Sequence, residues 1–191
     1  MGFRQAAVLS SVSFFLGVLF ICFNVDYRVL HTQLTDEVVG DAFQFYATFF
    51  NAPPAIKALL HAMMGIGILA LVGKLHKWDE SAVFFDGCSL GAFVFGIAVY
   101  TTVTIPSLRT IVDPVVGIDT RDDQIEAVRV LSAGNTILVV LLGAILVMQG
   151  GQEYAKRVEA RELAKVLAAE NASVDQNPNA APVSASEKKE Q

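Results

Sequence analysis

The sequence predicts an all-α membrane protein: a bundle of four transmembrane helices, with an amphipathic helix on the non-cytosolic side and a juxtamembrane helix in the cytosol. Hydrophobic residues make up 53% of the 191 residues and charged residues only 17%. Soluble domains carry about a quarter charged residues, so this apolar excess is too large for one small soluble core. The apolar residues also gather in four blocks, each close to the length that about 30 Å of hydrocarbon requires.

The four predicted spans are residues 6–23, 54–73, 82–105 and 130–148. In lipid a helix satisfies its own backbone hydrogen bonds, which favours helices for all four. The first block could instead be a cleaved signal peptide, but it is longer than a typical signal core. The sequence "ICFNVDY" that follows offers no small-residue cleavage site, so a signal anchor is favoured.

The distribution of lysine and arginine predicts that both termini are cytosolic. Four spans place the two ends and the link "KLHKWDE" on one side of the membrane. Nine of the fourteen basic residues fall on that side: Arg4, Lys74, Lys77, Lys156, Arg157, Arg161, Lys165, Lys188 and Lys189. The positive-inside rule makes this the cytosolic side.

This topology divides the chain into three predicted parts. Residues 1–150 form the four-span membrane domain, with non-cytosolic loops at 24–53 and 106–129. Residues 151–170 are rich in helix formers and predict a cytosolic juxtamembrane helix. Residues 171–191 are polar, contain prolines and lack aromatic side chains, which predicts a disordered cytosolic tail.

An amphipathic helix is predicted inside the first non-cytosolic loop. In "TDEVVGDAFQFYATFF" the apolar residues Val39, Phe43, Tyr46 and Phe50 recur at helical spacing, and "NAPP" ends the pattern. Two interpretations stay open at this stage. The helix lies on the membrane surface and contacts a client protein, or it is an ordinary helix packed within its own loop.

A few polar residues and glycines inside the spans are the candidate contact sites. His61 and Asn135 lie deepest, and Tyr100 lies nearby in the third span. Such groups either form hydrogen bonds between helices or contact a client protein. The role in hydrogen bonds between helices is favoured. Gly91 and Gly96 belong to a set of span glycines that lets helices approach closely, either within this bundle or against another protein.

The sequence gives little support for catalysis, metal binding or nucleic-acid binding. The three histidines are scattered, and no HExxH motif or Cys/His cluster occurs, so no catalytic residues, metal ligands or cofactor are predicted. Cys22 and Cys88 lie at opposite depths, which disfavours a disulfide. No basic surface with interleaved aromatic residues is evident, and the net charge is -5.

Several segments resemble the fungal endoplasmic-reticulum packaging chaperones for amino-acid permeases. They are "SFFLGVLF" leading into "FNVDY", "FYATFFNAPPAIKALLH", "FFDGCSLGAFVFGIAVY" and "SAGNTILVVLLGAILVMQ", between about Ser10 and Tyr154. The most specific piece is the aromatic run followed by "NAPP" and a span.

The resemblance implies a non-enzymatic, four-span protein of the endoplasmic-reticulum membrane, so the non-cytosolic side is expected to be lumenal. Its implied partners are polytopic amino-acid permeases, the COPII coat and membrane lipid. The resemblance implies that it keeps the permeases from aggregating, helps them to fold and promotes their packaging into COPII vesicles. The short tail departs from the family pattern at the expected coat contact.

The chain ends in "EKKEQ", which places Lys188 and Lys189 fourth and third from the carboxyl end. At the end of a disordered cytosolic tail this spacing matches a dilysine retrieval signal read by the COPI coat. The prediction depends on the topology and is independent of the resemblance.

Two other classes of membrane protein are alternatives to the chaperone. A small four-span membrane enzyme would need convergent catalytic groups, for which His61, Tyr100 and Asn135 are the only visible nucleus. A tetraspan scaffold of the plasma membrane normally carries disulfides outside the cytosol, and neither long loop contains a cysteine.

Overall fold

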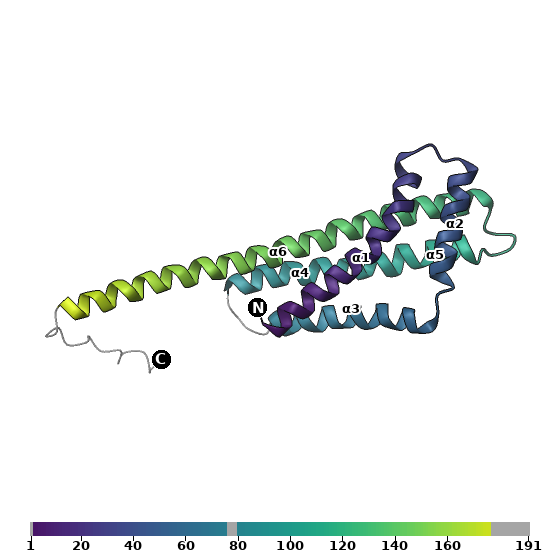
Figure 1. Ribbon diagram of the computed structural model, residues 1–191. Helices are drawn as coiled ribbons and strands as arrows, with labels where there is room; N and C mark the ends of the chain where they lie inside the picture. Colours follow the sequence, from purple (N-terminus) through teal and green to yellow (C-terminus); the bar gives the residue numbers. More distant parts are fainter. Residues whose placement is uncertain (1, 76–79, 177–191) are drawn as a thin grey trace. The chain divides into compact units, whose positions relative to one another are not determined.

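The computed structural model describes residues 2–75 and 80–176, and this part of the chain is helical with no β-strand. The all-α prediction is therefore confirmed. The elements in chain order are α1 (Phe3–His31), α2 (Asp36–Phe50), α3 (Pro54–Leu75), α4 (Glu80–Val99), the π-helix η1 (Tyr100–Thr104), α5 (Ile105–Val112) and α6 (Arg121–Gln176) (Figure 1).

Four helical stretches are long and apolar enough to cross a membrane, as predicted. They are Phe3–His31, Pro54–Leu75, Val83–Val112 and Arg121–Ala169. Each overlaps one of the predicted spans, the third except for residue 82, and each extends beyond its apolar block at one end or both. A helix ends where its backbone hydrogen bonds stop, and polar residues such as Asn24 and Asp26 do not stop α1.

The third span continues past its predicted end at residue 105. The helix continues through η1 and α5 to Val112, although Pro106 lies within the first turn of α5. Proline has no backbone N–H and cannot complete the hydrogen-bond ladder of the preceding turn. The π-helix stands at that turn, so the chain passes the proline without leaving the helical path.

Helix α2 has defined caps at both ends. The Thr35 hydroxyl caps its first turn by accepting from the backbone N–H of Val38, with N and O 3.4 Å apart. Asp36 and Glu37 follow in the first turn, where negative charge suits the helix dipole. At the other end Asn51 closes α2, and Pro54 opens α3.

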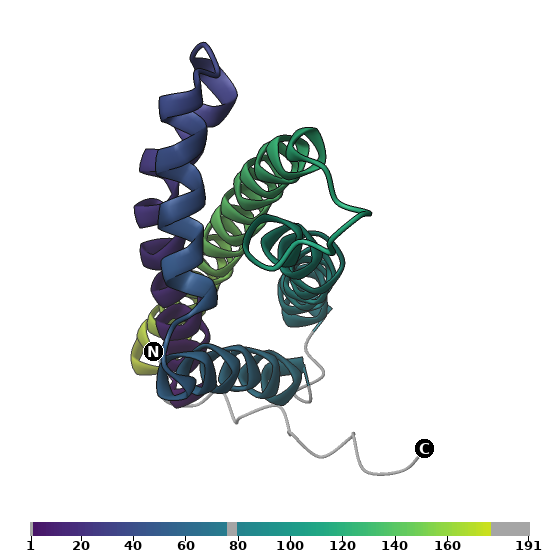
Figure 2. The same ribbon diagram turned by 90° about the vertical axis from the view of Figure 1, so that its right-hand side faces the viewer.

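The chain forms two compact units, residues 1–152 and 153–191. In the first unit α1 packs against α3, α3 against α4, and α2 against both α1 and α5 (Figures 1 and 2). The described part of the second unit is the C-terminal portion of α6, where Glu153 pairs with Arg157 and Glu162 with Lys165. The helix reaches Gln176, past the expected start of the tail at Asn171, because no proline or glycine occurs between Gly151 and Pro178.

Two apolar clusters hold the first unit together, one toward each end of the bundle. One joins Val8 and Val12 of α1 to Leu71 of α3, Phe93 of α4 and Ile145 of α6. The other joins α2 to its neighbours and contains Val29, Val38, Ala42, Tyr46, Ile111, Val128 and Leu131. The predicted apolar stripe of α2 is thus partly built into the bundle.

Two glycines allow the closest helix approaches. A Cβ atom at Gly67 of α3 would lie 2.5 Å from Cζ of Phe93 and 2.7 Å from the Ser11 hydroxyl, so only glycine fits there without movement. A Cβ atom at Gly134 of α6 would lie 3.2 Å from Val103. Small residues are expected at helix contacts in membranes, where close backbone approach supplies the packing energy.

Candidate functional site

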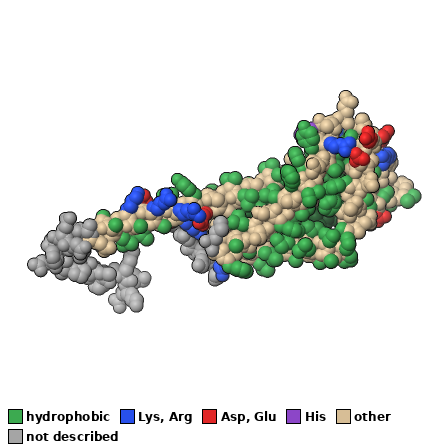
Figure 3. Space-filling view, in the orientation of Figure 1, with side chains coloured by type: hydrophobic (Ala, Val, Ile, Leu, Met, Phe, Trp, Pro, Cys, Tyr) green, Lys and Arg blue, Asp and Glu red, His purple; other side chains and the backbone are tan. Residues whose placement is uncertain are grey.

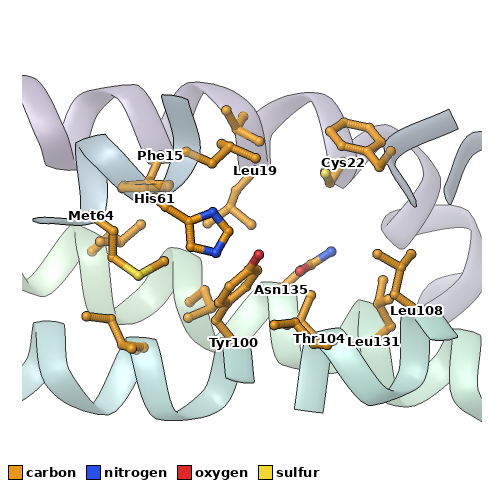
Figure 4. A pocket seen from close by; sticks show the side chains of 18 of the residues that line it. Phe15, Leu19, Cys22, His61, Met64, Tyr100, Thr104, Leu108, Leu131 and Asn135 are labelled. Atoms are coloured by element: carbon orange, nitrogen blue, oxygen red, sulfur yellow. The ribbon is translucent and has the colours of Figure 1, made fainter. Parts of the chain in front are cut away.

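A cavity of about 320 Å³ lies inside the first unit. Its walls come from α1, α2, α3, the α4–η1–α5 helix and α6, and most of the side chains that form them are apolar (Figure 4). The lining residues of α6 run from Leu131 to Leu142, a helix length of about 16 Å at a rise of 1.5 Å per residue. The cavity is therefore elongated along the bundle.

The three polar span residues singled out from the sequence all line this cavity. His61 comes from α3, Tyr100 from η1 and Asn135 from α6 (Figure 4). The rings of His61 and Tyr100 meet edge to face, with centroids 6.4 Å apart. Nδ1 of His61 hydrogen-bonds to the carbonyl oxygen of Lys57 at 2.7 Å, one turn back on the same helix. These contacts position the histidine at the cavity wall.

Asn135 belongs to a different set of contacts. Its Nδ2 donates to Oδ2 of Asp26 at 3.0 Å and to the hydroxyl of Tyr46 at 3.1 Å. Tyr46 in turn donates its hydroxyl hydrogen to Oδ1 of Asp26. We call Asp26, Tyr46 and Asn135 the triad; it ties α1, α2 and α6 together beside the cavity. All three side chains are almost fully buried.

Burial, and then the charge of Asp26, raise the pKa of the Tyr46 hydroxyl far above its ordinary value. The phenol therefore remains protonated at any physiological pH and remains a donor to Asp26. The predicted loop at 24–53 includes Asp26. In the structure it lies in α1 with 1% of its surface exposed, so that expectation was wrong for this residue.

A second buried polar group lies among α3, α4 and α6. Lys74 Nζ lies 2.7 Å from Oδ1 of Asp86, and the two side chains are only 9% and 2% exposed. Nζ also donates to Oε1 of Gln152 at 2.7 Å and to Oε1 of Gln149. We call Lys74, Asp86, Ser89, Gln149 and Gln152 the polar clamp.

The glutamine amides complete the clamp. Gln149 Nε2 donates to Oδ1 of Asp86 and to the Ser89 hydroxyl, both at 3.1 Å, and Gln152 Nε2 donates to Oδ2 of Asp86 at 2.9 Å. Each glutamine thus bridges the cation and the anion. Sequence reasoning missed this cluster because it placed Lys74 in the link that follows the second span. The signal available was Gln149 and Gln152, spaced three apart at the end of an apolar run.

The glycines proposed as a contact face separate into two positions. A Cβ atom at Gly96 would lie 3.5 Å from Leu138, and Gly96 lines the cavity. A Cβ atom at Gly91 would have no neighbour within 4 Å, and the same is true of Gly87. Gly91 is exposed on α4, so these two predicted residues do not share one face.

The stripe predicted on α2 also points inward in part. Val39 and Tyr46 are buried, with 2% and 3% of their surfaces exposed, while Phe43 and Phe50 are half-buried. Phe43 packs on the second apolar cluster, and Phe50 lines the cavity. The burial of Val39 and Tyr46 favours the packed helix over a helix that lies on the membrane surface.

Two further polar span residues, Thr101 and Thr102, have partners on their own helix. The Thr101 hydroxyl donates to the carbonyl oxygen of Ile97 at 2.9 Å, and the Thr102 hydroxyl donates to that of Ala98 at 2.7 Å. Both bonds lie within the same helical stretch.

Both cysteines are free thiols. No group of three or more histidine, cysteine, aspartate or glutamate side chains capable of holding a metal occurs in residues 2–75 and 80–176. The arrangement is suited to holding helices together around an apolar cavity.

The predicted retrieval residues Lys188 and Lys189 lie outside the described residues.

For the chain as a whole, the family model SHR3_chaperone, described as "ER membrane protein SH3", matches residues 1–190. No curated protein and no solved structure matches the chain.

Proposed function

Because the chain belongs to the SHR3 chaperone family of endoplasmic-reticulum membrane proteins, we propose that its clients are newly made amino-acid permeases. In this proposal it keeps their spans from aggregating, assists their folding and promotes their packaging into COPII vesicles. The family match over residues 1–190, together with four apolar helices, is the observation that carries the proposal.

The physical problem is that a permease reaches the membrane one span at a time. A polar group on an early span lacks its partner until later spans arrive, and an unsatisfied polar group in hydrocarbon costs several kcal/mol. Contacts between membrane helices through hydrogen bonds are worth only about 0.6 kcal/mol each on average. A chaperone that uses many such contacts can hold a span and still release it.

The outward face of α4 is the surface we propose for client contact. Gly87 and Gly91 form a GxxxG pattern, and neither has a neighbour within 4 Å. Phe84 and Phe95 flank them and are 60% and 56% exposed. A client helix can approach the backbone closely at the two glycines and pack against the two phenylalanines.

We further propose that both termini are cytosolic and that Lys188 and Lys189 return escaped protein through the COPI coat. Replacing both lysines with serine is expected to shift the protein from the endoplasmic reticulum to the Golgi. Fluorescence microscopy or glycan maturation on an attached lumenal reporter measures that shift. A matched variant in which Lys156 and Lys165 become serine keeps the charge change but leaves the terminal spacing intact. Unchanged location of the Lys188→Ser, Lys189→Ser variant would exclude the signal.

Deleting the gene is expected to retain amino-acid permeases in the endoplasmic reticulum while unrelated plasma-membrane proteins travel normally. Re-expression of the chain restores surface permeases, which uptake assays and microscopy measure. Normal surface permease in the deletion strain, in the absence of a redundant relative, would refute the proposed clients.

The same strain tests the proposed contact face. A photo-crosslinking amino acid at Gly91 is expected to capture permease intermediates, because Gly91 is exposed and unobstructed. The matched control is the same amino acid at Gly96, which lines the cavity on the same helix. Equal capture from both positions, or none from Gly91, would exclude the outward face of α4 as the client surface.

A further inference from the structure

We propose that the cavity binds one membrane phospholipid, with an acyl chain between the helices and the phosphate at Lys57. The proposal goes beyond the chaperone function, because it assigns a small-molecule ligand to the interior of the membrane domain. It rests on the shape of the cavity, on the chemistry of its walls and on Lys57, a cation that lines it.

The shape suits a hydrocarbon chain that lies parallel to the helices. The lining residues of α6 span about 16 Å along its axis. One leaflet of a bilayer contributes about half of the 30 Å hydrocarbon core, so the cavity is about one leaflet deep. Phe15, Met64 and Leu142 line it along with the polar residues, and most of its wall is apolar. In a membrane the available apolar molecules are lipid chains.

Lys57 supplies charge complementarity for a phosphate. It is exposed, lies in the first turn of α3 and lines the cavity. Its Nζ lies 5.6 Å from the centre of the Phe50 ring, and no ion pair forms between Lys57 and any other residue of 2–75 and 80–176. A basic residue at the membrane boundary attracts an anionic headgroup by about 1 kcal/mol.

The helices leave a route for a lipid from the side. Arg4 donates to the carbonyl oxygen of Gly73, and the Ser11 hydroxyl donates to that of Met63 at 2.8 Å, so α1 and α3 are joined toward one end. Toward α2 the two helices diverge (Figure 1). The surface is hollowed there, with hydrophobic side chains at its floor (Figure 3).

The test uses the full chain in lipid nanodiscs that contain a trace of phosphatidic acid with a photoactivatable diazirine at the end of one acyl chain. After illumination, mass spectrometry locates the label. We expect it on cavity residues such as Phe15, Met64 and Leu142. Lys57→Gln is expected to reduce this labelling about fivefold, the factor that corresponds to about 1 kcal/mol. A diacylglycerol probe with the same chain lacks the phosphate, so its weaker labelling should not change with Lys57→Gln.

Matched variants separate specific binding from damage to the fold. Gly96→Leu fills the cavity and is expected to abolish most labelling of its walls, whereas Gly91→Leu adds the same group on the outside of α4 and leaves it intact. Lys156→Gln controls for loss of charge. Thermal unfolding of each variant checks the fold. Label confined to outward residues such as Phe95 and Val140, or equal labelling of the two leucine variants, would overturn the proposal.

Discussion

Replacing Lys74 with methionine is expected to lower the free energy of unfolding of the membrane domain by about 3–5 kcal/mol. Methionine keeps the length and apolar stem of the side chain but removes the ammonium. Asp86 then remains 1% exposed with its two glutamine donors and no cation. Breaking one half of a buried ion pair leaves an uncompensated charge in a medium of low polarity, and this accounts for most of the cost.

The loss should be measured by reversible unfolding in mixed detergent micelles. Lys156→Met is the matched control, because Lys156 is exposed on α6. Its loss is expected to change the free energy of unfolding by less than about 0.5 kcal/mol, as is usual at surface sites. The change should also loosen the contacts of α3 with α4 and α6, since each clamp residue lies on one of these three helices.

A double variant distinguishes the charge effect from a packing effect. Lys74→Met combined with Asp86→Asn removes both charges, and the asparagine still has a side-chain oxygen for the glutamine amides. We expect the double variant to be more stable than Lys74→Met alone, because no buried charge is left unpaired. If the two substitutions were simply additive, the ion pair would not be the reason for the loss.

The helices could be predicted from the sequence because hydrophobic blocks of membrane length leave the backbone few alternatives. Their ends could not, because apolar composition marks the part of a helix that lies in lipid and not the residue where its hydrogen bonds stop. Thus α1 continues through Asn24 and Asp26 to His31, and the third span passes Pro106.

The polar interior shows a different limit. His61, Tyr100 and Asn135 could be selected from the sequence because each is polar within an apolar block, and all three line one cavity. Asp26 was missed because a carboxylate next to a loop is normally solvated. Its partners Tyr46 and Asn135 are 20 and 109 residues away in the chain, so only the packing of α1, α2 and α6 makes the site.

Tyr46→Phe is expected to destabilise the membrane domain by about 1.5–3 kcal/mol, the range for a hydrogen bond to a charged group. Phenylalanine fills the same space, so the second apolar cluster keeps its packing. The loss is confined to the hydroxyl, which donates to Asp26 and accepts from Asn135 at 3.1 Å. A buried acceptor without its donor costs more than the bond itself contributed.

The same substitution should release α2, because Tyr46 is the residue of α2 in the triad. Hydrogen exchange of the α2 amides is expected to accelerate, while that of α3 stays unchanged. Tyr27→Phe on α1 is the matched control, since Tyr27 neighbours Asp26 in sequence but is 50% exposed. Asp26→Asn tests the acceptor from the other side: an amide oxygen still accepts from Tyr46, so α2 should remain attached. If Tyr46→Phe left α2 protected and Tyr27→Phe did not, the triad would not be what holds this helix to the bundle.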